Sequence, residues 1–349
     1  MNSQTAVARQ TALAAPPPWF TALGGRVRDQ YGRHKRKLRV SLTDRCNLRC
    51  PYCMPETPQW LPREQLLSRD ELRRLVSLFV TRLGITNLRL TGGEPLLRKD
   101  LEDCVAQLSI LKSQGLERIS LTTNGILLAA RVRSLKDAGL DDLNVSLDAL
   151  SDAGFARMSG GRGSPQAVMA GILAAHEAGL PVKINAVILR GGNEDEILPL
   201  ARWALEHELP LRLIEFMPLD SGGQWNRERV VDAARMLDIL GREFRIEALP
   251  ESDDPARYYR LDGRGSLGII STISRPFCTR CDRVRLTANG ELYACLFAAQ
   301  GRDLRTPLRR GAADAEIEAL VRGQVWFKDR GYAQTGYVER PISMHSLGG

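Results

Sequence analysis

Three cysteines stand within eight residues of the chain, in the stretch CNLRCPYC at positions 46 to 53. Cys46, Cys50 and Cys53 follow the spacing C-x3-C-x2-C, and Pro51 opposes a helix between them. Thiolates are soft ligands that suit zinc or an iron-sulfur cluster. Structural zinc needs four ligands, whereas a four-iron cluster accepts three and leaves one iron free. The triplet therefore favours an open iron-sulfur cluster, with zinc as the alternative.

The remaining cysteines form a second triplet and one isolated thiol. Cys278, Cys281 and Cys295 have the spacing C-x2-C-x13-C. Taken alone, this triplet fits a zinc ribbon that lacks one ligand as well as it fits a second cluster. Clustered cysteines in a chain of cytosolic appearance indicate metal binding and argue against a disulfide framework. Cys104 lies in a helical stretch and is predicted to be a buried core thiol.

The composition predicts a soluble globular protein, since 43% of the 349 residues are hydrophobic and 26% are charged. No apolar run approaches the ~20 residues that span a bilayer. We expect a disordered leader over residues 1–36 and a cytoplasmic location. The formal charge of +8 suits a polyanionic partner, either nucleic acid or a small phosphate ligand. Charge alone does not distinguish these from a solvated basic surface.

Segments of alternating apolar residues take turns with helical segments over residues 37–240, which predicts an α/β fold with parallel strands and right-handed crossovers. The clearest helix is at 68–84, where Ser68 is the expected N-cap, Glu71 completes a capping box and Gly84 follows the last turn. The strands are expected at 37–43, 86–91, 117–123, 142–148, 181–189 and 210–216. We expect an incomplete (β/α)6 TIM-type barrel.

The predicted strands carry a polar face, although strands covered by helices on both sides are normally apolar throughout. The polar residues at period two are Arg39, Ser41, Thr43, Arg89, Thr91, Ser120, Thr122, Asn144, Ser146, Asp148, Lys183 and Asn185. In a barrel this face points inward and makes a lumen suited to a charged ligand. The alternative is a one-sided, half-exposed sheet.

Short motifs follow the predicted strands at their C-terminal ends, where barrel enzymes place their chemistry. They are the first cysteine triplet and the stretches TGGEP (91–95), TTNG (122–125) and SLD (146–148). Residues 241–349 change to short strands, with a hairpin expected at Asn289 and Gly290. We therefore expect a smaller β-rich region over 241–349 that carries the second triplet and closes the barrel.

The first triplet, with Tyr52 before its third cysteine and TGGEP after the second strand, resembles the radical S-adenosylmethionine superfamily. The second triplet, CDRVRLTANGELYACLF and the terminal Gly348 and Gly349 closely resemble the GTP 3',8-cyclases of molybdenum cofactor biosynthesis. This resemblance extends from about residue 38 to the last residue. It implies two [4Fe-4S] clusters and S-adenosylmethionine as cofactors, and the cyclisation of GTP as the reaction of a radical lyase.

The resemblance also implies roles for individual residues. The metal ligands would be Cys46, Cys50, Cys53, Cys278, Cys281 and Cys295. Contacts to S-adenosylmethionine are expected from Tyr52, Gly93, Glu94, Ser146 and Met217. Contacts to GTP are expected from Arg39, Arg89, Thr122, Lys183, Arg283, Val284 and Arg285. The residues implied in catalysis are Arg39, Arg283, Arg285, Gly348 and Gly349. For the diglycine tail, a disordered end is the alternative.

The implied partners are GTP, a low-potential electron donor, a second copy of the chain and cyclic pyranopterin monophosphate synthase as the downstream enzyme. Neither a membrane nor nucleic acid is expected as a partner. Two other classes of protein stay open at this point. One is a radical S-adenosylmethionine enzyme with an auxiliary cluster that modifies a peptide. The other is a zinc protein that binds nucleic acid through its positive charge.

Overall fold

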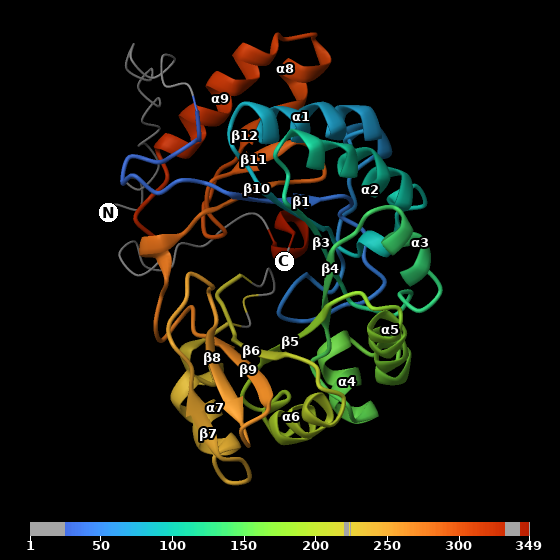
Figure 1. The fold of residues 1–349 in the computed structure, drawn as a ribbon, viewed down its shortest axis with the longest axis vertical. Coiled ribbons are helices and arrows are strands. Elements are labelled where there is room, and N and C mark those ends of the chain that lie inside the picture. The colour runs from blue at the N-terminus through green and yellow to red at the C-terminus, as the bar shows by residue number, and fades with distance from the viewer. Residues whose placement is uncertain (1–24, 220–222, 224, 332–342, 349) are drawn as a thin grey trace, which may run out of the picture.

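The computed structural model describes residues 25–219, 223, 225–331 and 343–348. Most of the predicted leader, and Gly349, lie outside the described residues. Within them, one mostly parallel sheet of twelve strands curls around a central space (Figure 1). No helix in these ranges is both long enough and apolar enough to cross a membrane.

The middle of the sheet consists of parallel strands that follow one another in chain order. Their bounds are β1 Lys37–Ser41, β2 Asn87–Thr91, β3 Arg118–Thr123, β4 Asp142–Ser146, β5 Val182–Ile188 and β6 Leu211–Glu215. Each strand pairs in parallel with the next. The alternation of strands and helices thus gives the predicted partial barrel.

Helices cover the outside of this sheet (Figure 1). Their bounds are α1 Arg69–Thr81, α2 Leu101–Ser109, α3 Val132–Asp137, α4 Asp152–Ser159, α5 Pro165–Glu177, α6 Ile197–Glu206 and α7 Ala233–Leu240. The capping box predicted for the first helix is confirmed, since Ser68 caps α1 and Glu71 returns the hydrogen bond. Gly84 has the left-handed conformation, with a φ of +74°, that ends the helical segment.

The C-terminal region extends the same sheet at both edges instead of closing it. The strands β10 Arg283–Leu286, β11 Glu291–Tyr293 and β12 Arg302–Asp303 continue from β1. The strands β9 Gly265–Ile270, β8 Arg257–Leu261 and β7 Ile246–Ala248 continue from β6. The expected hairpin is present between β10 and β11. Among the described residues the two edges are not hydrogen-bonded to each other, so the barrel is open where we expected closure.

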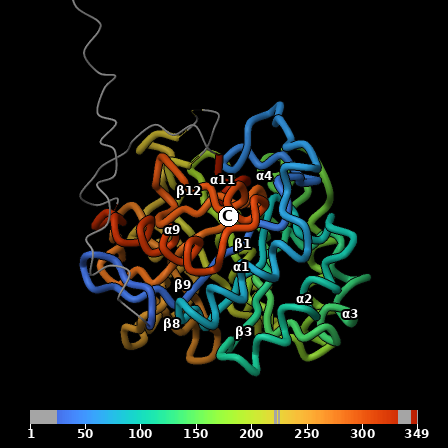
Figure 2. The backbone as a smooth tube through the Cα atoms, turned by 90° about the horizontal axis from the view of Figure 1, so that it is seen from above, coloured from blue at the N-terminus to red at the C-terminus, as the bar shows by residue number. Residues whose placement is uncertain are grey.

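The last helices are α8 Arg305–Arg309, α9 Asp314–Trp326 and α11 Met344–Leu347. Figures 1 and 2 both place the C-terminal end of the described chain in the middle of the barrel. Residues 25–36, at the end of the predicted leader, pack against the fold. Val27 is 1% exposed, and its amide donates to the carbonyl of Leu83. Residues 25–36 therefore belong to the folded part of the chain.

The strand register brings inward-facing cations from several strands into one row. Arg39 lies opposite Arg285 on one side and opposite Arg89 on the other. Arg89 in turn lies opposite Ser120. The alternate residues, such as Leu38, pack into the hydrophobic core. The predicted polar lumen is confirmed, because the sheet turns its period-two polar face inward.

Candidate active site

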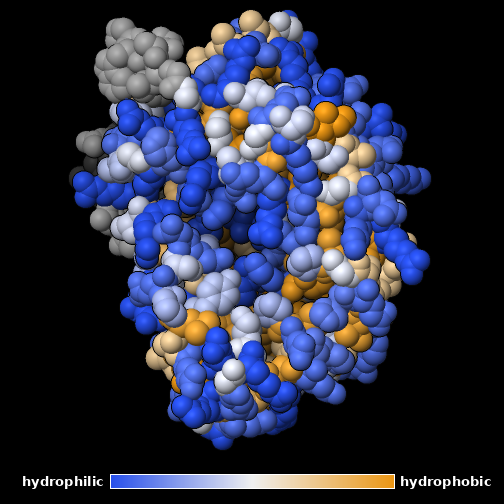
Figure 3. Space-filling view, in the orientation of Figure 1, coloured by the Kyte–Doolittle hydropathy of each residue, from blue (hydrophilic) through white to orange (hydrophobic). Residues whose placement is uncertain are grey.

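A cavity of about 450 Å³ occupies the barrel, and both cysteine triplets line it. A hollow is visible near the middle of the mostly hydrophilic face in Figure 3. Residues that are more than two hundred positions apart, such as Cys53 and Cys278, meet at this cavity. The fold therefore brings together the two groups of thiols that the sequence separates.

The first triplet occupies the loop after β1. The amide of Leu48 donates to the Sγ of Cys46 at 3.4 Å, and the Nδ2 of Asn124 donates to the Oδ1 of Asn47 at 2.7 Å. Burial raises the pKa of Cys46 to about 11, and it raises the pKa of Cys53 further. Such thiols release their protons when a metal binds, so the loop is organised for a metal that supplies compensating charge.

An apolar shell surrounds this loop. Its buried members are Tyr52, Met158, Leu189, Phe216, Leu219 and Met344, with Met217 packed against them. The Tyr52 hydroxyl donates to the Oδ2 of Asp148 at 2.6 Å, and the amide of Val187 donates to the other carboxylate oxygen at 2.8 Å. Burial raises the pKa of Asp148 to about 6. The shell limits the access of water to the first triplet.

The loop after β2 is glycine-rich because it passes close to the cysteine loop. A Cβ at Gly93 would lie 2.3 Å from the carbonyl oxygen of Arg45, and one at Gly92 would lie 2.7 Å from that of Thr43. The carboxylate of Glu94 accepts from the Thr123 hydroxyl and the Asn124 amide, each at 2.7 Å. Burial raises the pKa of Glu94 to about 7. Glu94 thus joins the ends of two strands while it lines the cavity.

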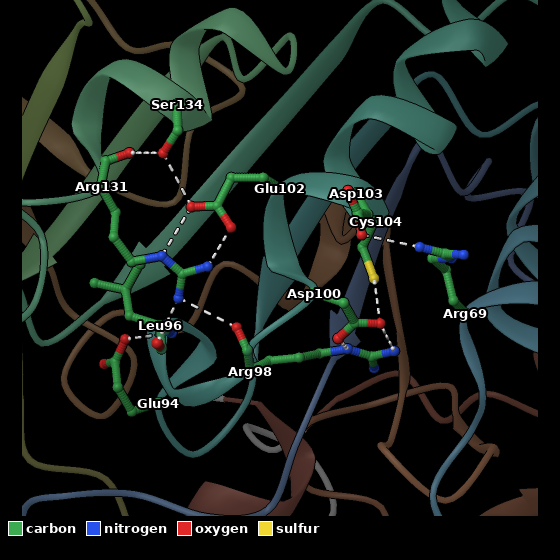
Figure 4. Close-up of polar contacts among 10 residues, drawn as sticks. All are labelled: Arg69, Glu94, Leu96, Arg98, Asp100, Glu102, Asp103, Cys104, Arg131 and Ser134. Carbon is green, nitrogen blue, oxygen red and sulfur yellow. Dashed lines mark hydrogen bonds and ion pairs between the residues drawn. The ribbon is translucent and has the colours of Figure 1, made fainter.

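Charged contacts from the outer helices hold this glycine-rich loop from behind (Figure 4). The guanidinium of Arg131 donates to the carbonyls of Leu96 and Arg98 at 2.6 and 3.2 Å. Its Nε donates to the Oε1 of Glu102 in α2 at 2.8 Å. Arg131 precedes α3, so it connects two helices to the loop that carries Glu94. This support fixes the loop from outside the cavity.

The row of arginines makes one side of the cavity strongly positive. Burial lowers the pKa of Arg39 well below its usual value, and the neighbouring guanidinium groups of Arg285 and Arg89 lower it further. The pKa of Arg89 falls to about 10, mainly because of burial. Burial also lowers the pKa of Lys183. Burial is the largest cause of each shift, and the neighbouring cations add a repulsion that a polyanionic ligand would relieve.

The second triplet is held by cations. The Nζ of Lys328 donates to the Sγ of Cys281 at 3.3 Å and to the carbonyl of Arg283 at 2.9 Å. Burial alone would raise the pKa of the Cys281 thiol, but Lys328 and Arg283 lower it to about 6. The pKa of Cys281 is therefore shifted in the opposite direction to those of Cys46 and Cys53.

Gly348, the last described residue, lies inside the barrel. The carbonyl of Gly348 accepts a hydrogen bond from the guanidinium of Arg285. Gly348 has a φ of +73°, and a Cβ there would lie 2.4 Å from the Cγ2 of Thr91. Only glycine therefore fits this position without displacing its neighbours. Gly349 lies outside the described residues.

Most of the residues predicted from the resemblance meet at the cavity. The lining includes Arg39, Tyr52, Arg89, Gly93, Glu94, Thr122, Ser146, Lys183, Met217, Arg283, Arg285 and all six cysteines of the triplets. Val284 and Gly348 are not part of this lining. The side chain of Val284 is fully buried in the hydrophobic core on the other face of β10. That side chain is not available to a ligand in the cavity.

Several lining residues were missed by the sequence reasoning. Arg212, in β6, donates to the Oδ1 of Asn185 at 2.9 Å and lines the cavity. Its position in the sixth predicted strand, two residues after Pro210, was the available signal. The sequence singled out Asn124 only as part of the TTNG motif and gave it no role of its own. Lys328, just after α9, had no signal, because nothing in its local sequence distinguishes it from other basic residues.

The donor set fits iron-sulfur clusters. Among the described residues, no three His, Cys, Asp or Glu side chains converge on one point as ligands of a single ion. Each triplet instead places its thiols along the cavity lining. In a four-iron cluster each thiolate binds its own iron, and three thiolates leave one iron open. The residues that would hold the clusters are thus the six cysteines at 46, 50, 53, 278, 281 and 295.

Family models match two successive parts of the chain. Residues 40–204 match the Radical SAM superfamily, and residues 209–334 match Molybdenum Cofactor Synthesis C. The first range contains the first cysteine triplet and the glycine-rich loop. The second contains the second triplet and Lys328.

Among solved structures, Streptococcus suis SuiB bound to S-adenosylmethionine has a TM-score of 0.57 at 14% identity. The match covers 84% of this chain and 68% of that one. SuiB bound to the precursor peptide SuiA has a TM-score of 0.57 at 15% identity, over 80% of this chain and 66% of that one. At these identities the likeness shows a shared fold.

Bacterial relatives match over nearly the full length. A GTP 3',8-cyclase of Mycobacterium sp. (strain KMS) is 48% identical, over 93% of this chain and 94% of the relative. The GTP 3',8-cyclase of Mycolicibacterium smegmatis is 45% identical, over 98% and 97%. GTP 3',8-cyclase 2 of Mycobacterium tuberculosis (strain H37Rv) is 45% identical, over 93% and 92%. The cavity with its two thiol triplets, and these relatives, place the chain in the GTP 3',8-cyclase family of the radical S-adenosylmethionine superfamily.

Proposed function

We propose that the chain converts GTP into (8S)-3',8-cyclo-7,8-dihydroguanosine 5'-triphosphate, the first step of molybdenum cofactor biosynthesis. The observation that carries this proposal is that both cysteine triplets line one cavity beside a row of arginines. The cofactors are S-adenosylmethionine and two [4Fe-4S] clusters. The names of the near-full-length relatives support the same reaction.

The proposed roles follow the position of each side chain around the cavity. Cys46, Cys50 and Cys53 hold the first cluster, and Cys278, Cys281 and Cys295 hold the second. S-adenosylmethionine lies against Tyr52, Gly93, Glu94, Ser146 and Met217. GTP lies against Arg39, Arg89, Thr122, Lys183, Arg283 and Arg285, to which we add Arg212. The cations offset the charge of the triphosphate, because guanidinium forks match phosphate oxygens.

The clusters and S-adenosylmethionine, when bound, supply the radical chemistry of the superfamily. The chain binds the two small molecules side by side and orients the ribose, because a small displacement would expose the wrong hydrogen. The apolar shell around Tyr52 and Met158 excludes water from the first cluster. Gly348, which has no side chain, accepts a hydrogen bond from Arg285 beside the substrate site, and we assign catalytic roles to Gly348 and Gly349.

The partners proposed for this function are a low-potential electron donor and cyclic pyranopterin monophosphate synthase, which consumes the product. We also propose a homodimer and a cytoplasmic location. The positive charge of the chain is gathered partly inside the cavity, where it suits a nucleotide triphosphate. A membrane or a nucleic acid is not needed to account for it.

The test is an anaerobic reaction of the reconstituted chain with S-adenosylmethionine and each of the four ribonucleoside triphosphates. We expect about eight iron atoms per chain. Of the four nucleotides, we expect only GTP to give 5'-deoxyadenosine and a cyclised nucleotide in the presence of S-adenosylmethionine. Replacement of either triplet by alanine should leave about four iron atoms and abolish the nucleotide product. A colourless protein that contains zinc, or formation of 5'-deoxyadenosine that does not depend on GTP, would refute the proposal.

A further inference from the structure

Lys328 is a buried cation at the second cysteine triplet, with 4% of its surface exposed. Its Nζ lies 3.3 Å from the Sγ of Cys281 and 2.9 Å from the carbonyl oxygen of Arg283. Among the described acidic residues, none forms an ion pair with it within 4 Å. The ammonium group is therefore held by a sulfur atom and a main-chain carbonyl, and its charge is directed at a cluster ligand.

The N-terminal segment holds the same cysteine loop from behind. The guanidinium of Arg33 donates to the carbonyl of Cys278 at 2.7 Å, and the Nζ of Lys35 donates to the carbonyl of Cys281 at 2.8 Å. Asp29 pairs with Arg33 at 2.6 Å and with Lys35 at 2.7 Å. Lys328 adds a third cation. Cations still outnumber carboxylates around these two cysteines when Asp282 and Arg283, which follow Cys281, are included.

The same segment also fixes the chain around Lys328. The amide of Gln30 donates to the carbonyl of Trp326 at 3.2 Å, and Arg33 donates to the carbonyls of Asp329 and Arg330 at 2.7 and 2.8 Å. These contacts bracket Lys328 on both sides. The ammonium group is therefore held in place by the fold and not by its own flexible side chain alone.

The first triplet has carboxylates as its charged neighbours. Asp148 accepts from Tyr52 at 2.6 Å and acts electrostatically on Cys50, and Glu94 acts on Cys46. Arg49 is a cation near Cys46, but its guanidinium is directed at the carbonyls of Cys46 and Leu48. The two triplets therefore differ in their polar neighbours, because a cation contacts a thiol of the second directly and the carboxyl groups of Asp148 and Glu94 lie near the first.

We propose that Lys328 is a positioning residue that raises the reduction potential of the second cluster above that of the first. Positive charge and N–H to sulfur hydrogen bonds stabilise the more negative, reduced form of a cluster. Neighbouring carboxylates have the reverse effect. The difference would keep the first cluster strongly reducing while the second stays easier to reduce. This inference depends on the second cluster of the proposed function.

The test measures the two clusters separately by redox titration followed by electron paramagnetic resonance. A chain with Cys46, Cys50 and Cys53 replaced by alanine keeps only the second cluster, and the converse triple variant keeps only the first. We expect a less negative midpoint potential for the second. In the chain that keeps only the second cluster, Lys328→Met should make the midpoint potential of that cluster more negative. Lys328→Arg should recover at least half of the potential that Lys328→Met loses. The first cluster should not respond to Lys328→Met.

Arg280→Met is the matched control, since Arg280 lies between Cys278 and Cys281 but is exposed and pairs with Asp253 at 3.4 Å. Loss of the Arg280 charge should move the midpoint potential of the second cluster much less than Lys328→Met does, because solvent screens the exposed guanidinium. An unchanged midpoint in Lys328→Met at full iron content would overturn the inference and leave the proposed function standing. Equal shifts of both clusters would overturn it as well. Absence of iron from the second triplet would refute both proposals.

Discussion

The guanidinium group of Arg285 donates a hydrogen bond to the main-chain carbonyl of Gly348 inside the barrel. Arg285 is also the strand neighbour of Arg39, so the tail reaches the row of cations directly. Gly348 thus lies against the group of residues that we assign to the substrate. The contact depends on a glycine, since Gly348 has a φ of +73° and no space for a Cβ.

Gly348→Ala should displace the tail from Arg285. The new Cβ would lie 2.4 Å from the Cγ2 of Thr91. We expect the rate of GTP-dependent 5'-deoxyadenosine formation to fall by roughly 100-fold, as small displacements near a reacting centre do. The melting temperature should change little, because the tail is a terminal segment.

Gly311→Ala is the control for the strain that an alanine causes at a positive φ, because Gly311 lies away from the tail, after α8. Gly311 has a similar φ of +81°, but no atom lies within 4 Å of the position that its Cβ would take. We expect it to keep the full rate. If both variants lost activity equally, or if Gly348→Ala kept the wild-type rate, the assigned role of the tail would be wrong.

Gly93→Ala should destabilise the fold and impair loading of the first cluster. The added Cβ would meet the carbonyl oxygen of Arg45 at 2.3 Å, and main-chain atoms cannot move aside as a flexible side chain can. We expect a loss of about 3 kcal/mol in the free energy of unfolding, measured by urea denaturation, with fewer bound iron atoms. Gly323→Ala, within α9 and without a neighbour in reach, should instead stabilise the chain by about 0.5–1 kcal/mol. A Gly93→Ala protein as stable as the wild type would contradict the close approach of the two loops.

Asp148 should give the unfolding free energy of the cluster-free chain a pH dependence. Burial raises its pKa from 3.8 to about 6. The folded state therefore binds this proton more tightly than the unfolded state does. The contribution to stability is complete below about pH 4 and is lost as the pH rises to about 6. Two pKa units correspond to about 3 kcal/mol at most.

Asp148→Asn should remove this fall in stability between about pH 4 and pH 6. Urea unfolding at several pH values is the measurement. Asp137→Asn, at an exposed position of α3, is the matched control and should leave the profile of the wild type. If the profile of Asp148→Asn kept the wild-type slope, another group would be responsible for it.

Local patterns in the sequence were enough to predict the strands of the barrel and the direction of their polar faces. Arg39 and Arg89 could be assigned to the lumen because period two in a strand decides which side chains share a face. The spacing of the first cysteine triplet favoured an iron-sulfur cluster, whereas the assignment of the second triplet to a cluster came from the resemblance. The meeting of Cys53 and Cys278 at one cavity was implied by the resemblance alone, since no local pattern connects distant segments.

The rest depended on tertiary packing. Nothing in the sequence of β9 and β10 says that β9 pairs with β6 and β10 with β1, because these pairings are set by the whole sheet. Asp29 and Lys35 fell within the predicted disordered leader over residues 1–36. Their side chains are fully buried. This burial becomes favourable only because Lys35 forms an ion pair with Asp29 and donates a hydrogen bond to the carbonyl of Cys281.

The row of cations should make the apoprotein sensitive to polyanions. Burial and the guanidinium groups of Arg285 and Arg89 hold the pKa of Arg39 well below its usual value. A triphosphate that binds there removes this repulsion and stabilises the folded state. At a hundredfold excess over its Kd, inorganic tripolyphosphate should add about 2.7 kcal/mol to the free energy of unfolding, seen as a higher melting temperature. The increase should shrink in high salt.

Arg39→Gln tests the source of this effect. Removal of one of the repelling charges should raise the melting temperature of the apoprotein and reduce the further increase with tripolyphosphate. Arg133→Gln, on the exposed side of α3, removes the same charge from the outside of the barrel and should change neither value. An equal response to tripolyphosphate in both variants would place the anion on the outer surface. A lower melting temperature of the Arg39→Gln apoprotein would instead mean that this guanidinium stabilises the empty barrel, contrary to the repulsion that its lowered pKa indicates.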